Sequence, residues 1–212
     1  MTQKRCKTNS FFQKREKEGI NELKVILLGD AGVGKTNIIN RYIYGNFDTS
    51  STPTLGSAFG EKKINKEGTI YLLKIWDTAG QEKFNSITKL FIRGSQIILL
   101  VYSIDNLKSF ENLKPWIDYI RDELPESKYV LGIVGNKTDL YENEVITEEQ
   151  GKKYATDNNA FFYLVSAKCE PRSIQKLFEL ILDEFIYTIG DLVSNDSSIK
   201  IDDSDNKRRK CC

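Results

Sequence analysis

Short apolar runs recur along the chain and predict the strands of a sheet. The runs LKVILLG, QIILLVYSI, YVLGIVG and FFYLVSA are typical of buried strands. The segment EKKINKEGTIYLLKIWD adds two strands joined by a turn at Glu67 and Gly68. The pattern therefore predicts strands at residues 23–29, 61–66, 69–77, 96–104, 129–135 and 161–167.

Segments with apolar residues at helical spacing lie between or after these runs. One follows the first run and ends at Gly45, a residue suited to a helix C-cap. Another spans 109–124 and contains Pro115, which should kink the helix unless the helix begins there. The last begins near Pro171, which is favoured in a first helical turn. Strands that alternate with helices predict an α/β fold, with a mostly parallel six-stranded sheet flanked by helices on both faces.

The same pattern predicts one domain with two polar appendages. The chain has 212 residues, of which 40% are hydrophobic, enough for one buried core. Residues 1–22 lack sustained periodicity and predict a flexible extension, whereas 23–189 carry the strands and helices. From 190 to 212 the composition turns to Asp, Ser, Asn and Lys, which is typical of a disordered tail. The longest apolar run, IILLVY, is too short to cross a membrane, and the first residues lack a secretory signal.

Composition excludes several kinds of chemistry. The 31 Lys and Arg nearly balance the 30 Asp and Glu, so the net charge of +1 gives no reason to expect a nucleic-acid partner. The chain has no histidine, which removes Ser-His-Asp and Cys-His triads and every His-based metal site. The 4 cysteines fit neither a zinc site nor a disulfide framework, which favours a reducing compartment.

The residues GDAGVGKT, 29–36, fit the phosphate-loop pattern G-x-x-x-x-G-K-[ST] between a predicted strand and a predicted helix. Such glycines let backbone N–H groups converge on phosphate oxygens, and the helix directs its positive end at them. Lys35 can reach the β- and γ-phosphates, and the Thr36 hydroxyl can ligate Mg²⁺. The alternative is a glycine-rich turn with an exposed lysine. The candidate phosphate-binding residues are Gly29, Asp30, Ala31, Gly32, Val33, Gly34, Lys35, Thr36 and Asn37, with Gly80 from a later loop.

Two further motifs follow predicted strands and favour guanine over adenine. In NKTD, 136–139, the Asp139 carboxylate can accept from both N1–H and the exocyclic amine of guanine, a donor pair that adenine lacks. Asn136 can hold the loop or contact the base, and the Lys137 stem can lie along the ring. In SAK, the Ala167 N–H can reach the guanine oxygen. The candidate guanine-binding residues from these motifs are Asn136, Lys137, Asp139, Ser166, Ala167 and Lys168.

The segment WDTAGQE, 76–82, supplies groups suited to hydrolysis. Asp77 is placed to hold Mg²⁺ through water, the Gly80 N–H can meet a γ-phosphate, and Gln81 can orient an attacking water. Gln81 is therefore the candidate catalytic residue. The alternative is a solvated polar loop without a role.

Over residues 23–189 the chain resembles a Ras-superfamily small GTPase, and its Rab branch in particular. The resemblance adds the segments LGSAF, LLKIWD, KFNSIT, FIRGS and LVYSID to the motifs above. It implies the G-domain fold of P-loop NTPases, an Mg²⁺ cofactor, and a Thr54 that completes the Mg²⁺ shell begun by Thr36 and Asp77. It also implies that Phe47 packs against guanine. FIRGS lacks the paired tyrosines and Ser103 replaces a usual acidic residue, while LGSAF with GNK before Thr138 is similar to endosomal Rabs.

The resemblance implies a switch in vesicle traffic that converts GTP and water to GDP and phosphate. No arginine in the motifs faces the γ-phosphate, so we expect slow hydrolysis without an activating protein that supplies one. Ala31 stands where some relatives have Gly, and its methyl group can hinder that arginine. Expected partners are effectors on the switch loops, an exchange factor, an activating protein, the prenylation machinery and a GDP-dissociation inhibitor, with the chain itself monomeric.

Two of the predicted functional features, the aromatic patch and the terminal cysteines, also have an explanation without a function. Phe59, Trp76 and Phe91 match the aromatic patch with which Rabs meet effectors, but all three can equally be core residues. The terminal Cys211 and Cys212 match the pattern that receives two geranylgeranyl groups, or else are incidental thiols. Lipidation would place the protein in the cytosol and on the cytoplasmic face of an intracellular membrane, of endosomal type by the resemblance.

Two other functions use the same phosphate loop. The first is another P-loop enzyme, such as a kinase or ATPase, against which NKTD argues. The second is a binding module that does not hydrolyse nucleotide, against which the presence of Thr54, Asp77 and Gln81 argues.

Overall fold

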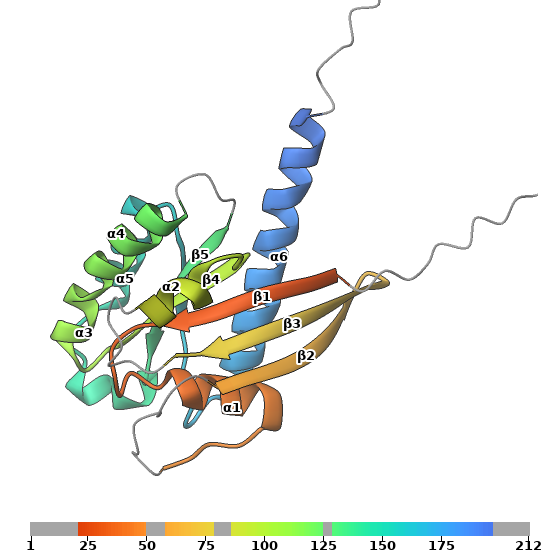
Figure 1. Cartoon of the computed structure of the whole chain (residues 1–212). Coiled ribbons are helices and arrows are strands. Elements are labelled where there is room, and N and C mark those ends of the chain that lie inside the picture. The colour runs from red at the N-terminus through yellow and green to blue at the C-terminus, as the bar shows by residue number, and fades with distance from the viewer. Residues whose placement is uncertain (1–20, 50–57, 79–85, 125–128, 197–212) are drawn as a thin grey trace, which may run out of the picture.

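The structure, a computed structural model, describes residues 21–49, 58–78, 86–124 and 129–196 (Figure 1). Its sheet contains six strands in the order β2-β3-β1-β4-β5-β6. Only β2 runs antiparallel to its neighbour among the five strand pairs, which confirms the mostly parallel sheet. The strands are β1 (Asn21–Leu28), β2 (Ala58–Lys66), β3 (Thr69–Asp77), β4 (Ile97–Ser103), β5 (Val130–Asn136) and β6 (Phe161–Leu164).

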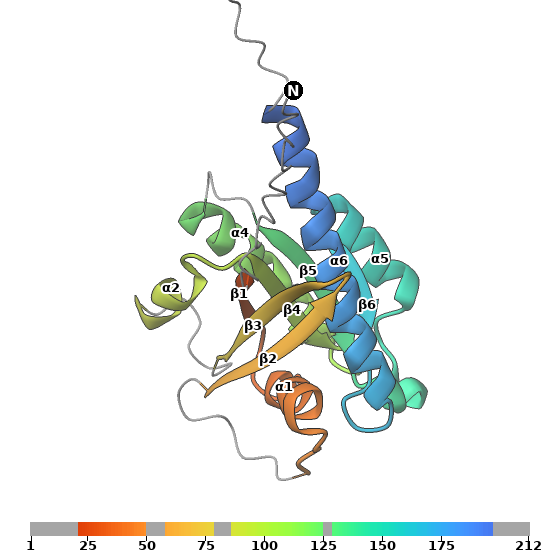
Figure 2. The same cartoon turned by 90° about the vertical axis from the view of Figure 1, so that its right-hand side faces the viewer.

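Helices cover both faces of the sheet, as predicted (Figures 1 and 2). On β1, Val25 and Leu27 join the hydrophobic cluster under α1 and α6, whereas Ile26 and Leu28 point into the cluster under α2, α4 and α5. This alternation is what a strand buried on both sides requires. The helices are α1 (Lys35–Tyr44), α2 (Ser86–Ile92), α3 (Leu107–Glu111), α4 (Leu113–Glu123), α5 (Glu148–Asp157) and α6 (Pro171–Asp196), with a 3-10 helix, η1, at Thr138–Asn143.

The helix predicted over 109–124 is in fact two helices. Asn106 caps α3 by accepting from the Ser109 N–H, and Asn112 separates α3 from α4. Pro115 is the third residue of α4 and therefore lies in the first turn, where no intrahelical partner for a backbone N–H is needed. Of the two possibilities predicted for Pro115, a kink within a helix or the start of a helix, the structure shows the start.

Among the described helices, α2, α5 and the 3-10 helix η1 were not predicted. α2 has only seven residues. α5 buries only Gly151 and Ala155, but it begins with a capping box in which Thr147 and Gln150 satisfy each other's backbone N–H groups. A cap at the sequence TEEQ, and not an apolar stripe, is its sequence signal.

The predicted domain ends differ from the observed ones. β1 begins at Asn21, slightly before the predicted start at 23. α6 continues past Gly190 to Asp196, so a helix occupies the first part of the predicted tail. The periodicity explains this, because Leu192 and Val193 follow Ile189 at helical spacing. Residues 1–20 and 197–212 lie outside the described part of the chain. Within the described part, no helix combines the length and apolar character that crossing a membrane requires.

Candidate functional site

The predicted site residues follow the carboxyl ends of the parallel strands, which meet at one edge of the sheet (Figure 1). The phosphate loop follows β1, Asp77 ends β3, Asn136 ends β5 and the SAK segment follows β6. In open α/β sheets this edge is where ligands bind.

The phosphate loop is held so tightly that two of its positions require glycine. Gly29 has φ +140°, and a Cβ there would lie 2.1 Å from the Val101 carbonyl oxygen. Gly34 has φ +98°, and a Cβ there would lie 2.3 Å from the Asn136 Nδ2. Any side chain would therefore push the loop away from β4 and from the guanine motif.

The first turn of α1 presents its backbone N–H groups without a competing side chain. Gly34 is the N-cap, and no side-chain hydrogen bond caps the helix. N–H groups left in this way at a helix start, together with the helix dipole, favour an anion.

Lys35 is a buried cation beside this loop. Its Nζ donates to the carbonyl oxygens of Gly29, at 2.8 Å, and Asp30, at 2.9 Å. Burial lowers the pKa of Lys35 to about 8, although Asp77 and Asp30 act in the opposite direction. Because burial disfavours the charge, anionic phosphates close to the ammonium would stabilise it.

Thr36 and Asp77, two of the three predicted Mg²⁺ ligands, are in contact. The Thr36 Oγ1 donates to the Asp77 Oδ2 at 2.6 Å, and Asp77 is buried. A hydroxyl and a carboxylate oxygen in contact are hard donors that fit Mg²⁺, which takes few protein ligands and keeps the rest of its shell for phosphate and water. The predicted third ligand, Thr54, lies outside the described residues.

Asn136 connects the phosphate loop to the guanine motifs. Its Nδ2 donates to the Val33 carbonyl oxygen at 2.8 Å, and its Oδ1 accepts from the Ala167 N–H at 3.3 Å. The side chain is 2% exposed. Of the two roles predicted for Asn136, the structure therefore displays the holding of the loops. The Ala167 N–H was predicted to face guanine. In the structure it donates a long hydrogen bond to the Asn136 side chain.

Ser166 holds the carboxylate predicted to recognise guanine. Its Oγ donates to the Asp139 Oδ1 at 2.6 Å and accepts from the Cys169 N–H at 3.0 Å. Ser166 is fully buried, so its hydroxyl holds the Asp139 carboxylate from the protein interior. Lys137 adopts φ +68°, which is uncommon for a residue with a side chain and typical of a constrained functional turn.

Some predicted residues use their side chains to hold other parts of the structure. The Asn37 amide group exchanges two hydrogen bonds of 3.1 Å with the Asp48 backbone, which fixes the segment after α1. The Asp30 Oδ2 accepts from the Asn112 Nδ2 at 2.5 Å. Asn112 was not predicted as a site residue, because only the fold brings the break between α3 and α4 to the phosphate loop.

The three aromatic residues of the predicted effector patch form one row of rings. The ring centroids of Phe59 and Trp76 lie 4.8 Å apart, and those of Trp76 and Phe91 lie 5.3 Å apart. Trp76 and Phe91 are half-buried against the cluster under α2, α4 and α5, whereas Phe59 is 46% exposed. Trp76 and Phe91 therefore pack against the core, and the Phe59 ring is the exposed one of the three.

The remaining predicted residues of the hydrolytic and lipidation motifs lie outside the described part of the chain. They are Gly80, Gln81, Cys211 and Cys212.

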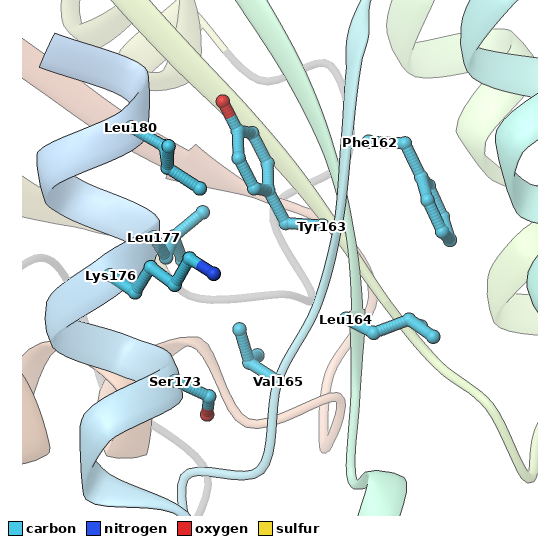
Figure 3. Close-up of a pocket in the computed structure, with 8 residues that line it drawn as sticks. All are labelled: Phe162, Tyr163, Leu164, Val165, Ser173, Lys176, Leu177 and Leu180. Atoms are coloured by element: carbon cyan, nitrogen blue, oxygen red, sulfur yellow. The ribbon is translucent and has the colours of Figure 1, made fainter. Parts of the chain in front are cut away.

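A cavity of about 200 Å³ lies between β6 and α6 (Figure 3). Tyr163, Val165, Leu177 and Leu180 are among its lining residues. It is smaller than the roughly 300–1,000 Å³ usual for ligand pockets, and no predicted site residue lines it.

Comparison with known proteins identifies relatives over nearly the whole chain. The Ras family model matches residues 24–187. The chain is 36% identical over 194 residues to Ras-related protein Rab-22A of Homo sapiens. This match covers 91% of this chain and 99% of that protein. It is 36% identical over 191 residues to Ras-related protein RabC of Dictyostelium discoideum, with coverage of 89% and 96%. It is 35% identical over 205 residues to Ras-related protein RGP2 of Oryza sativa subsp. japonica, with coverage of 89% and 93%.

We expect Asn136→Ala to weaken both the fold and the site. The substitution removes the buried bonds to Val33 and Ala167, which should cost about 1–3 kcal/mol of unfolding free energy and lower the Tm by roughly 2–12 °C. Thermal unfolding of the variant and of the unaltered chain, with and without GDP, measures this effect and shows whether nucleotide still adds stability.

Asn65→Ala is the matched control. Asn65 also accepts a backbone hydrogen bond, from the Gly68 N–H at 3.1 Å, but it is an exposed residue near the end of β2. It should change Tm by much less and leave the GDP effect intact. Equal shifts for the two variants would contradict the role given to Asn136.

Proposed function

The chain belongs to the Rab branch of the Ras superfamily of small GTPases, and on this premise we propose which of its residues carry the switch. As a member of that family, it is a GTP-hydrolysing switch in vesicle traffic. One observation carries the assignment of residues. The Asn136 side chain joins the phosphate loop to the guanine motifs, so that one nucleotide can contact both.

Residues of the phosphate loop bind the β- and γ-phosphates. Lys35 supplies the positive charge, and the backbone N–H groups from Gly29 to Asn37 supply hydrogen bonds from the loop and the uncapped start of α1. The burial of Lys35 supports this role, because phosphate oxygens would offset the cost of holding its charge away from water.

Guanine lies between the two later motifs in this proposal. Asp139, oriented by Ser166, accepts from N1–H and the exocyclic amine, while the Ala167 N–H donates to the base oxygen. The stem of Lys137 covers one face of the ring and Phe47 packs beside it. Lys168 completes the loop, with its carbonyl oxygen held from α1.

Thr36, Asp77 and Thr54 would hold Mg²⁺. When bound, Mg²⁺ neutralises charge on the β- and γ-phosphates. The contact between the Thr36 hydroxyl and the Asp77 carboxylate supports the first two residues as a ready-made pair. Asp77 contributes through water in this assignment, as a carboxylate beside a hydrated cation does.

Gln81 orients the water that attacks the γ-phosphorus. A bond forms from the water oxygen to phosphorus, the bond to the bridging oxygen breaks, and the proton leaves with the phosphate. Positioning and charge stabilisation supply the rate, so the lack of histidine does not impair this chemistry. The loop motifs contain no arginine, and an activating protein would supply one, worth roughly 10³ to 10⁵ in rate.

Loss of the γ-phosphate then releases the loops around Thr54 and Gly80. Effectors that recognise the GTP form contact these loops and the aromatic row of Phe59, Trp76 and Phe91, of which Phe59 is the open ring. An exchange factor and a GDP-dissociation inhibitor complete the cycle around a monomeric chain.

A double lipid anchor places the switch on the cytoplasmic face of an intracellular membrane, which we propose is endosomal. Rab-22A and Rab-31 among the relatives, and the terminal Cys-Cys pattern, support the Rab type of modification at Cys211 and Cys212, while the LGSAF segment supports the endosomal type. Two chains give stable anchoring where one gives only reversible binding. The four cations of KRRK just before them add attraction to an anionic leaflet.

Gln81→Leu tests the hydrolytic role. Phosphate release from GTP by the purified full chain should fall by roughly ten- to hundredfold, because the water loses its orientation while the phosphate contacts remain. Gln150→Leu, which removes a cap of α5 away from the site, should hydrolyse GTP at the normal rate. If Gln81→Leu loses affinity for GDP and GTP to the same extent as activity, Gln81 holds the site together and does not act on water.

Replacement of Cys211 and Cys212 by Ser tests the anchor. The variant should hydrolyse GTP normally and move from the membrane fraction to the soluble fraction of expressing cells, and its intact mass should lack two isoprenoid groups. Cys169→Ser is the control, since Cys169 is an exposed thiol within the domain and its loss should leave the protein on membranes. A double-Ser protein that stays on membranes would refute the anchor.

A further inference from the structure

Arg41 bonds to backbone carbonyl oxygens of two distant segments. The residue lies near the end of α1, and its Nη1 donates to the Gly45 oxygen, just past the helix, at 2.6 Å. Its Nε donates to the Ala167 oxygen at 2.9 Å and its Nη2 to the Lys168 oxygen at 3.2 Å. One side chain thus fixes the SAK segment to a helix that lies 126 residues earlier in the sequence.

The same guanidinium lies next to the aromatic residue proposed to pack on guanine. The Arg41 Cζ is 5.7 Å from the centroid of the Phe47 ring. Cations within about 6 Å of an aromatic centroid are attracted by its face. Phe47 is itself only partly buried against the cluster under α1 and α6, so this contact contributes to holding the ring.

We propose that Arg41 positions the guanine-binding residues, setting the Ala167 N–H against the base oxygen and Phe47 against the base ring. This inference rests on the guanine site proposed above. Ala167 is held at its N–H by Asn136 and at its carbonyl by Arg41, so both ends of the residue are restrained. The bond to Asn136 is the longer, at 3.3 Å, and the charged bond from Arg41, at 2.9 Å, is the stronger restraint.

The chemistry of arginine suits this role better than that of lysine. A guanidinium presents several N–H donors in a rigid plane, which can satisfy three carbonyl oxygens at fixed directions. An ammonium is a point charge on a flexible stem. Arg41→Lys therefore keeps a positive charge at the end of α1 but loses the fixed geometry, which separates positioning of the SAK segment from stabilisation of the helix end.

The test compares two ligands that differ at the lactam edge of the base. GDP carries the base oxygen and N1–H, whereas the 5′-diphosphate of 2-aminopurine riboside lacks both but keeps the exocyclic amine. Equilibrium affinities of the full chain for both ligands are measured for the unaltered protein, Arg41→Lys and Arg41→Gln. We expect both variants to bind GDP about five- to fiftyfold more weakly and the analogue by a smaller factor, because both ligands contact Phe47 but only GDP carries the oxygen that Ala167 contacts. The preference for GDP over the analogue should thus shrink, and GTP should lose as much affinity as GDP because the γ-phosphate is not involved.

Arg121→Gln is the control, because its Nη2 donates to Asn158 at the exposed surface of α4, and it should leave both affinities unchanged. If the Arg41 variants weaken both ligands by one factor, so that the preference stays constant, Arg41 only stabilises the fold and the inference is wrong. A protein whose unaltered form shows no preference for GDP over the analogue would instead contradict the proposed contact of Ala167 with guanine. Because Arg41→Lys keeps the charge, it provides a readout even where Arg41→Gln fails to fold.

Discussion

The hydrogen bonds of one buried amide, Asn136, hold the two halves of the site together. Its Nδ2 holds the phosphate loop at Val33, and its Oδ1 holds the SAK segment at Ala167. A Cβ at Gly34 would lie 2.3 Å from this amide, so the loop comes close only because a glycine stands there. A phosphate group and a purine base are far apart on one nucleotide, and specificity for that nucleotide requires their subsites to be fixed relative to each other. Asn136 supplies that constraint at the end of β5, and Arg41 reinforces it from α1.

The site keeps polar groups buried in an arrangement that a nucleotide would complete. Lys35 is 5% exposed and its pKa is lowered by burial, Asp77 is 1% exposed, and the start of α1 has no side-chain cap. Burying a charge costs stability, and a helix start without a side-chain cap leaves N–H groups for an anion. Anionic phosphates beside Lys35 and the start of α1 would add to the hydrogen bonds that Lys35 already makes, which gives a physical reason for nucleotide to stabilise the protein.

Much of the fold and the centres of the motifs could be predicted from sequence, because buried strands and glycine-rich turns are local signals. The runs that form β4 and β5 are almost wholly apolar, and the run of β1 is interrupted only by Lys24. Each motif follows a strand closely, so a parallel sheet brings them to one edge. α5 was missed because it buries little apolar surface and depends on its cap. The extension of α6 through Gly190 was missed because the polar composition after residue 190 was given more weight than the helical spacing of the apolar residues there.

The supporting contacts could not be predicted, because they join residues that are distant in sequence. An arginine in the last turn of a helix predicts binding to the carbonyl groups of that helix end, such as Gly45, but nothing in the sequence indicates its reach to Ala167. The Asn37 side chain bonds to the Asp48 backbone, and the Ser166 hydroxyl donates to the Asp139 carboxylate. In each case the type of residue fits several partners, and the tertiary fold selects one of them.

The central claim is that these motifs form one guanine-nucleotide site, and the affinity of the full chain for GDP against ADP tests it most directly. A site that hydrogen-bonds N1–H, the exocyclic amine and the base oxygen loses the contacts of Asp139 and Ala167 with the base when adenine enters. Equilibrium competition in the presence of Mg²⁺ should therefore show GDP bound at least about 10³-fold more tightly than ADP. Affinities for GDP and ADP within about tenfold of each other would contradict the account, since the phosphate loop alone would then determine binding.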